Sequence, residues 1–461
     1  MRKLLIVLLL AGCSVQPKYE RPAVELPQAW KESAPPHLRP GAEDGRWWRI
    51  YQDPLLDKTI DEALAGNGDL LVAAARVDEA RALLSESRSF FYPRIDATAS
   101  AARQRTSERT AFQAPGMPHE FSTYRGALEV SYELDLFGRL RSNADAARAE
   151  LEASEASREA VRLALAAQVA KSYFSLRSLD EQVFLIRKTI SLREDALGLQ
   201  RKRVQGGVTS EFELRQLEAE AAVVRSQLPP LEALREREEV ALSVLLGRSP
   251  KQVFEGNVEV THRMDEKPGP PAVPSGMPSE LLLRRPDLVE AERVLESANA
   301  RVGVARAEMF PSIVLTGALG SESSSLSNLF SGPSLIWSLA AGITQPIFAG
   351  GRLKARTEAA EARERAVLAQ YQQAIRSAFG EVRAALIAQS RARESYDAES
   401  ARAAALNETL RLARLRYQNG VASQLDVIDA ERGLLEAQRA RIAALQAHRA
   451  AVADLFRALG G

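Results

Sequence analysis

The sequence RVQGGVTSEFELRQLEAE (residues 203–220) has a counterpart 213 positions later, RYQNGVASQLDVIDAERG (residues 416–433). In both stretches a basic segment reaches a glycine turn and continues as an acidic, amphipathic segment. The same separation of 213 positions relates Gly247 to Gly460, each of which follows a leucine. Correspondence at one fixed separation indicates two tandem copies of one structural unit.

The upstream parts of the two copies are 218 positions apart, as Pro93 and Pro311 show. A loop absorbs the small difference in length at little cost in free energy. We expect each copy to contain a helix, an extended hairpin, a very long helix, a turn and a returning helix. The expected segments are a signal peptide (1–12), an N-terminal segment (13–60), the first copy (61–247), a proline-rich linker (248–279) and the second copy (280–461), with hairpins at 94–137 and 312–348, long helices at 139–205 and 351–418, and returning helices at 210–246 and 423–459.

The long helix of the first copy contains no proline and would extend about 100 Å at the usual rise per residue. Near its far end apolar residues recur every seven positions, which predicts a coiled-coil seam. One long helix on an ordinary globular core is the alternative, but such a rod is several times the width of a core. The seam comprises Leu165, Val169, Leu176, Leu179, Val183, Ile186, Ile190, Leu197 and Val204.

The lengths of the shorter helices suggest how a long helix is covered. The returning helix 210–246 and the opening helix of the second copy, about 280–310, together match the length of a long helix. We therefore expect these two helices to stack end to end.

Glycines mark the turn of each copy. Gly207 and Gly420 suit the left-handed conformation that closes a helix C-terminus. The sequences at 210–213 and 423–426 fit capping boxes for the helices that follow. The sequence of each copy therefore predicts a tight helical hairpin.

Stretches with a period of two are expected to form membrane-spanning strands. YRGALEVSYELDLF (124–137) has one apolar and one acidic face, SLIWSLAAGITQPIF (334–348) alternates similarly, and 94–102 and 312–320 supply partners. Their lengths match tilted transmembrane strands. Four strands cannot close a barrel, and lipid forbids open sheet edges, so we expect three protomers to supply twelve strands. Two soluble hairpins packed on the helices are the alternative.

The N-terminal sequence MRKLLIVLLLAGC has a basic start, a short apolar core and small residues before Cys13, the single cysteine. The apolar run is too short to span a membrane as a helix and is typical of a signal peptide. LAGC also resembles the bacterial lipobox, which implies cleavage before Cys13 and lipidation of its sulfur. Ser14 follows, rather than the aspartate associated with inner-membrane retention, which implies the outer membrane. An ordinary signal peptide with an incidental cysteine is the alternative.

Composition disfavours several classes of function. The chain carries 61 basic and 60 acidic residues, a net charge of +1, so nucleic acid is a poor candidate partner. The sequence has no metal-ligand spacing around its four histidines, no phosphate-binding glycine loop and no nucleophile–base set. We therefore expect neither an enzyme nor a bound cofactor or metal.

Together these features resemble the TolC-like outer-membrane factor family, specifically the lipoprotein branch that serves drug-efflux pumps. The resemblance covers essentially all of the mature chain. Its marks are the lipobox, the strand entries Tyr92-Pro93 and Phe310-Pro311, LDLFGRLR (134–141), QPIFAGGRLKA (345–355), LLLRRPDL (281–288) and RYQNGVASQLDVIDA (416–430).

The resemblance implies a mainly α fold with transmembrane β-strands. The chain would be the tandem-repeat protomer of a homotrimer, with a twelve-stranded β-barrel in the cell outer membrane and a twelve-helix periplasmic α-barrel carrying an equatorial domain. This lipid-anchored, membrane-spanning trimer would be a passive exit duct for drugs or other small molecules. A periplasmic adaptor protein would join it to an inner-membrane transporter, of the resistance-nodulation-division type.

The resemblance also implies a gate at the periplasmic end. The family's constriction carries aspartates at two positions of the last hairpin, which a three-fold axis would repeat as rings that attract cations and raise one another's pKa. A routine surface ion pair beside a helix cap is the alternative. One departure is Ala422, where some members carry a gate-locking arginine. The expected gate residues are Tyr417, Leu425, Asp426, Asp429 and Arg432, with Glu213 at the related position of the first copy.

The turns themselves are expected to dock the helical hairpin of the adaptor, because their small residues permit close approach of helix ends. Ordinary turn chemistry is the alternative. The expected docking residues are Gly206, Gly207, Val208, Thr209, Gly420, Val421, Ala422 and Ser423.

Three rival functions stay open: a type I protein-secretion duct, a metal-efflux duct and a structural periplasmic coiled-coil lipoprotein. The lipobox and an end shortly after the repeat favour small-molecule efflux over protein secretion. The five scattered methionines form no copper-binding cluster. A structural lipoprotein would not need amphipathic strands.

Overall fold

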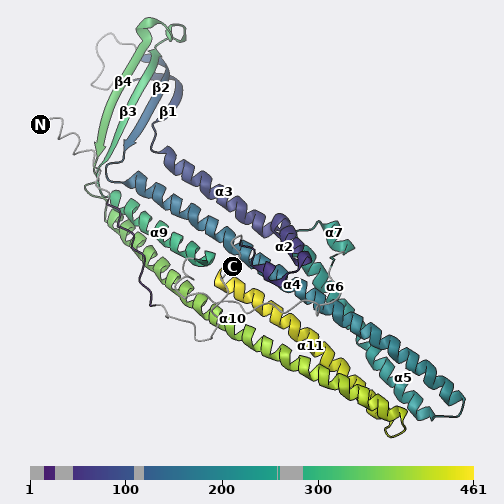
Figure 1. Cartoon of the computed structure of the whole chain (residues 1–461). Coiled ribbons are helices and arrows are strands. Elements are labelled where there is room, and N and C mark those ends of the chain that lie inside the picture. Colours follow the sequence, from purple (N-terminus) through teal and green to yellow (C-terminus); the bar gives the residue numbers. More distant parts are fainter. Residues whose placement is uncertain (1–14, 26–44, 108–118, 257, 260–283) are drawn as a thin grey trace. The chain divides into compact units, whose positions relative to one another are not determined.

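A computed structural model of the chain describes residues 15–25, 45–107, 119–256, 258–259 and 284–461 (Figure 1). The chain divides into two compact units, each of which is described by itself. The first unit contains the strands and the helical residues within 76–155 and 290–372. The second contains the helical residues within 45–75, 156–256, 284–289 and 373–461.

In the first unit four antiparallel strands form one sheet in the order of the sequence: β1 (Arg94–Arg105), β2 (Glu120–Leu134), β3 (Ser312–Ser323) and β4 (Leu335–Thr344) (Figure 1). The predicted hairpin strands of both copies are confirmed. The sheet also joins the copies, because β2 pairs with β3, with Leu128 opposite Leu319. β1 and β4 are its edges.

One face of this sheet is apolar across all four strands. Residues that lie directly opposite each other in an antiparallel pair share a face, and the register aligns Ala97, Leu128, Leu319 and Trp337. This apolar face is not packed against helices: Trp337 is 75% exposed and Leu339 81%. The alternative of soluble hairpins packed on the helices therefore does not describe this sheet.

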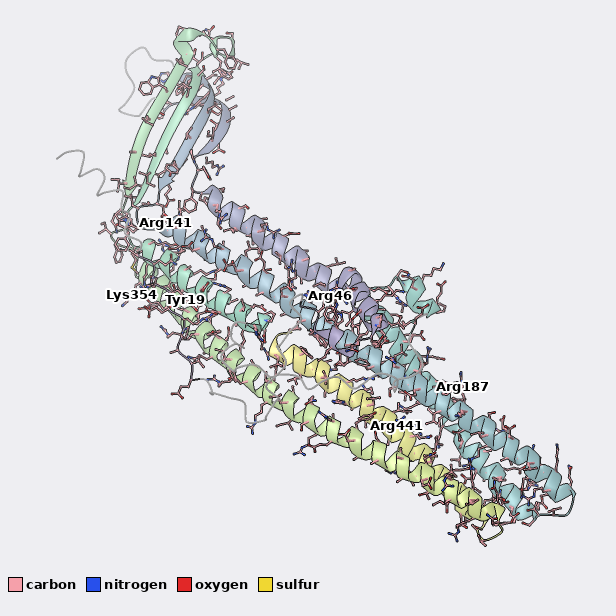
Figure 2. The ribbon with its side chains drawn as sticks, viewed as in Figure 1. Tyr19, Arg46, Arg141, Arg187, Lys354 and Arg441 are labelled. Carbon is pink, nitrogen blue, oxygen red and sulfur yellow. The ribbon has the colours of Figure 1, made fainter. Side chains whose placement is uncertain are left out.

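Two helices of 67 residues dominate the α part: α4 (Arg139–Gln205) and α10 (Arg352–Gln418). The predicted seam of α4 is confirmed, since Val169, Leu176 and Ile186 are fully buried. An ion pair on the surface also joins α4 to α6: Arg187 (labelled in Figure 2) lies 2.6 Å from Glu232. The other described helices are η1 (Trp47–Tyr51), α2 (Pro54–Gly66), α3 (Gly68–Ser89), α5 (Glu211–Ser226), α6 (Leu228–Leu245), α7 (Pro250–Glu255), α9 (Pro286–Ala307), η3 (Leu326–Asn328), η4 (Gly332–Ser334) and α11 (Gln424–Leu459).

The prediction of one uninterrupted helix over 210–246 is wrong, because α5 ends at Ser226 and α6 begins at Leu228. Pro229 and Pro230 explain the break: proline lacks a backbone N–H and fits only the first turn of a helix. At the equivalent positions the second copy has Ile442 and Ala443, and α11 continues without interruption.

The predicted stacking partner is also wrong, because each returning helix meets the opening helix of its own copy. In the first copy Asn67 Nδ2 donates to the carbonyl oxygen of Leu245 at 2.9 Å. In the second copy Arg285 Nη1 donates to the carbonyl oxygen of Ala458 at 3.1 Å. These four residues occupy equivalent positions, so both copies build the same joint from different side chains.

The first joint is a close approach of backbones. Gly247 has φ +70°, and a Cβ added there would lie 2.0 Å from the carbonyl oxygen of Gly66. Only glycine fits both the left-handed conformation and this space.

A buried ion pair anchors the second unit. Asp53 and Arg177 lie 2.5 Å apart, each with 5% of its side chain exposed. Asp53 also accepts from the hydroxyl of Tyr173 at 3.1 Å and caps α2 through the N–H of Leu55. The aromatic residues Trp47, Trp48, Tyr51 and Phe174 are buried in the same unit.

Replacing Asp53 with alanine should destabilise the protein by about 3–5 kcal/mol, because it would leave the charge of Arg177 buried without its carboxylate. The thermal unfolding temperature in detergent measures the effect. Asp61→Ala is the matched control, since its pair with Arg46 is well exposed and should contribute about 1 kcal/mol at most. Equal shifts for the two variants would contradict the prediction.

Candidate functional site

The turns between α4 and α5 and between α10 and α11 have the same backbone structure. Gly207 N–H donates to Val204 and Val208 N–H to Arg203, at 3.0 and 2.9 Å. In the second copy the N–H groups of Gly420 and Val421 donate to Tyr417 and Arg416, both at 3.0 Å. With φ of +66° and +73°, Gly207 and Gly420 close two Schellman motifs, which confirms the predicted left-handed positions.

The cap of α11 is the predicted reciprocal box. Ser423 Oγ accepts from the N–H of Asp426 at 3.3 Å, and Asp426 Oδ2 accepts from the N–H of Ser423 at 2.7 Å. The hydroxyl of Ser423 also donates to this carboxylate at 2.9 Å. These hydrogen bonds lower the pKa of Asp426 within one protomer, and the bond from the Ser423 hydroxyl contributes most. The rise in pKa predicted for a ring of aspartates would require the carboxylates of several copies to lie close together.

The cap of α5 is only half of a box. Ser210 Oγ accepts from the N–H of Glu213 at 3.3 Å. The carboxylate of Glu213 instead accepts from the hydroxyl of Thr209 and from the side-chain amide of Gln200, the latter at 3.3 Å. Glu213 is therefore bound to its own hairpin, and the prediction of a full capping box here is wrong.

The residues expected in the gate lie at the start of α11 and the end of α10. Leu425 is 46% exposed, and the side chain of Asp429 is 61% exposed. Arg432 lies 3.5 Å from Asp429, the pair expected on one helical face. Tyr417 Oη accepts from Arg203 Nη1 at 3.3 Å, so this tyrosine links the two hairpins.

Large apolar side chains are exposed around both turns. Val208 and Val421, both expected in the docking surface, are 69% and 64% exposed. Phe212, which the sequence analysis missed, is 76% exposed on the first turn of α5. Its place two residues after the capping Ser210, in the first turn of the helix, was the signal that could have found it.

Sequence reasoning also missed the carboxylates and cations that pair along this end of α11. Glu431 lies 2.6 Å from Arg193 and 2.8 Å from Arg414. Burial lowers the pKa of Arg193, and the nearby Glu431 opposes that shift. Arg432 pairs with Glu220 of α5. Because these partners lie far apart in sequence, no local motif announces them.

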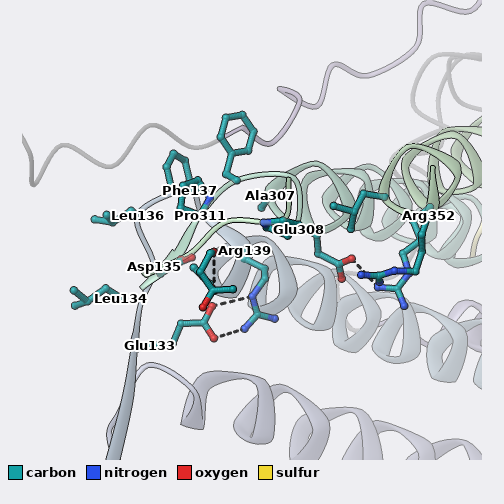
Figure 3. Close-up of a pocket in the computed structure, with 16 residues that line it drawn as sticks. Glu133, Leu134, Asp135, Leu136, Phe137, Arg139, Ala307, Glu308, Pro311 and Arg352 are labelled. Carbon is teal, nitrogen blue, oxygen red and sulfur yellow. Dashed lines mark hydrogen bonds and ion pairs between the residues drawn. The ribbon is translucent and has the colours of Figure 1, made fainter. Parts of the chain in front are cut away.

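A second polar cluster lies in the first unit, where strands meet helices (Figure 3). Glu133 accepts two hydrogen bonds from Arg139, at 3.0 and 2.7 Å, and these raise the pKa of Arg139. The carboxylate of Asp135 accepts from the first N–H groups of α4. Phe137 and Phe310 stack with ring centroids 4.8 Å apart. The cluster borders a cavity of about 280 Å³ and fastens the sheet to the helices.

Among the described residues, no helix combines the length and apolar character needed to cross a membrane. The described residues likewise contain no group of three or more metal-ligating side chains. Cys13 lies outside the described residues.

The chain resembles known proteins over nearly its whole length. It is 35% identical to outer membrane protein OprJ of Pseudomonas aeruginosa, covering 99% of this chain and 95% of that protein. It is 34% identical to the antibiotic efflux pump outer membrane protein ArpC of Pseudomonas putida (98% and 93%) and 32% identical to the cation efflux system protein CusC of Escherichia coli K12 (99% and 98%).

Solved structures show the same fold. The open state of the MtrE outer membrane channel of Neisseria gonorrhoeae superposes with a TM-score of 0.85 at 34% identity, covering 97% of this chain and 98% of that one. The CmeC outer membrane channel of Campylobacter jejuni gives 0.86 at 27% identity, with 97% and 95% covered.

The family model for outer membrane efflux proteins matches two segments, residues 59–248 and 277–461. This family consists of channel proteins that serve efflux across the outer membrane, not of enzymes. The chain belongs to the outer membrane efflux protein family, the TolC-like channels of tripartite efflux systems.

Proposed function

We propose that three copies of this chain assemble into the exit duct, with the twelve strands forming one barrel. The observation that carries this proposal is the apolar face of the sheet, which is exposed in a single chain and ends at two open edges, β1 and β4. Lipid would cover the apolar face, but the free N–H and C=O groups of an edge strand need partners in a membrane. Pairing β4 of one copy with β1 of the next satisfies both edges.

Electrophoresis without boiling tests the assembly. The protein extracted in detergent should migrate at three times the mass of the chain and fall to a single chain after heating. Purified trimers should also form cation-selective pores in planar bilayers. A monomer that needs no detergent would support the structural coiled-coil lipoprotein instead.

The gate of this duct would be formed by the start of α11. Asp426 and Asp429 follow the turn directly, and Leu425 and Asp429 keep much of their surface exposed in one chain. Three copies around an axis would bring these side chains together. The relative MtrE has been captured in an open state, which supports a duct that closes and opens.

The two turns would dock a periplasmic adaptor protein. The exposed apolar side chains of Val208, Phe212 and Val421 surround the two glycine turns and offer a surface that another helical hairpin can cover. The adaptor would connect the duct to an inner-membrane transporter, of the resistance-nodulation-division type.

The cargo would be drugs or other small molecules. The relatives named for antibiotic and for cation efflux are nearly equally similar to this chain, so a metal-efflux duct stays the alternative, with a type I protein-secretion duct behind it. Deleting the gene and measuring sensitivity to antibiotics, to silver and to copper separates the first two. Sensitivity to metal ions alone would reject drug export.

Lipidation of Cys13 would anchor the mature chain. Cys13→Ser should therefore abolish the mass of the acyl groups in mass spectrometry of the mature N-terminus, because no thiol is left to form the thioether. Channel assembly is expected to persist if the strands alone hold the protein in the membrane. An unmodified Cys13 in the wild-type protein would reject the lipobox assignment.

A further inference from the structure

A buried carboxylate of the first copy holds an arginine of the second. Only 5% of the side chain of Glu220 on α5 is exposed, whereas Arg432 on α11 is about half exposed. Arg432 donates through Nε to Glu220 Oε2 at 2.8 Å and through Nη2 to the other carboxylate oxygen. Such a two-point contact fixes the orientation of both groups as well as their distance.

Burial makes the pair sensitive to the loss of either partner. A carboxylate withdrawn from water is costly unless a charge or hydrogen bonds compensate it. If Arg432 moved away, Glu220 would be left as an uncompensated buried charge. Separation of α11 from α5 at this level therefore requires Glu220 to regain water or to find another cation.

Apolar clusters flank the pair on both sides, and both connect helices of the first copy to α11. Both clusters bring residues of α5 and α11 together, one on each side of the pair. Toward the turns the cluster is Leu197, Leu214, Leu217, Ala221 and Ile428, and away from the turns it is Leu179, Val183, Ile186, Ile190, Val224, Leu228, Leu231 and Leu435.

We propose that Glu220 is a latch for the gate, a positioning residue that acts through Arg432. By holding Arg432, it fixes the start of α11 against α5 and keeps Asp426 and Asp429 at the narrow end of the duct. The proposal rests on the proposed function. The latch links the two hairpins within α5 and α11, whereas Tyr417 and Arg203 link them nearer the turns.

The pair also borders a cavity. A cavity of about 530 Å³ between α4, α5 and α11 is lined by both Glu220 and Arg432, together with Glu436 and Arg439. A charged side chain that enters this cavity would compete for one partner and release the other.

Glu220→Gln removes the charge but keeps the size of the side chain. Single-channel conductance in planar bilayers should rise severalfold, because α11 is no longer held to α5. Glu218→Gln is the matched control on the same helix: Glu218 pairs with Arg201 and Arg215 on the exposed surface, and its loss should leave conductance unchanged. The exchange Glu220→Arg/Arg432→Glu restores an ion pair and should return conductance toward the wild-type value.

A second measurement does not depend on current. Spin labels at Glu218→Cys and Glu436→Cys report the distance between α5 and α11 in detergent, and Glu220→Gln should lengthen it. If Glu220→Gln does not assemble, Arg432→Gln and the exchange variant are measured instead. If the charge-removed variants change neither the distance nor the conductance, the latch is overturned but the duct is not. A longer distance without a change in conductance has the same consequence. Wild-type trimers that pass no current would overturn the duct itself.

Discussion

Single-channel conductance should increase severalfold, and cation selectivity should fall, when Asp426 and Asp429 are both replaced by alanine. Three copies would place six carboxylates around the axis, and charged rings of this kind select cations while their side chains narrow the pore. Both residues lie within the first two turns of α11. Conductance and reversal potential in planar bilayers with a salt gradient measure the two effects separately.

Two controls separate charge from helix capping. Asp426→Ala also removes the reciprocal cap of Ser423, which costs about 1 kcal/mol, whereas the double asparagine variant removes only the charges. Selectivity should fall in both variants. Glu394→Ala/Glu408→Ala removes the same number of negative charges, from exposed ion pairs on α10. It should leave conductance and selectivity unchanged. Wild-type selectivity in the double asparagine variant would refute the gate assignment.

Export should be abolished by glutamate at Gly207 or at Gly420, with no loss of trimer. A charged side chain at the turn would obstruct the close approach of an adaptor hairpin. The space inside the protein permits the change, because a Cβ added at either glycine meets nothing within 4 Å. The left-handed conformation adds a strain of about 1–2 kcal/mol, which the remaining contacts of the hairpin should tolerate.

Alanine at the same positions is the matched control, since it introduces the same backbone strain without charge or bulk. The minimum inhibitory concentration of an exported drug and the amount of heat-sensitive trimer are measured in parallel. Glutamate variants should be as sensitive as cells that lack the channel, and alanine variants should stay resistant. Normal export by both glutamate variants would rule out adaptor contact at the turns.

Local signals allowed much of the fold to be predicted. The left-handed glycines, the cap of Ser423 and the alternation of β2 and β4 each depend on neighbouring residues, and all are present as expected. The break at Pro229 also had a local signal, but the strong helical repeat around it concealed that signal.

Pairing across the chain was harder to predict. Glu220 and Arg432 are 212 positions apart, and neither is unusual in its own helix. The contacts that join each returning helix to its own copy, those of Asn67 and Arg285, likewise bridge residues 178 and 173 positions apart. Periodicity gives the face of a helix that is buried but not the helix that covers it, so these contacts required the three-dimensional structure.

The uninterrupted course of α11 has a mechanical consequence. The helix has 36 residues, which corresponds to a length of about 54 Å at the helical rise. Its C-terminal end is held by Arg285, which donates a hydrogen bond to Ala458. Because the helix is long, a small rotation about its C-terminal end would move Asp429, near the other end, by a much larger distance. In the first copy the break at Gln227 divides the corresponding arm into two shorter helices, α5 and α6. In the proposed duct, the unbroken arm of the second copy would therefore transmit motion to the gate.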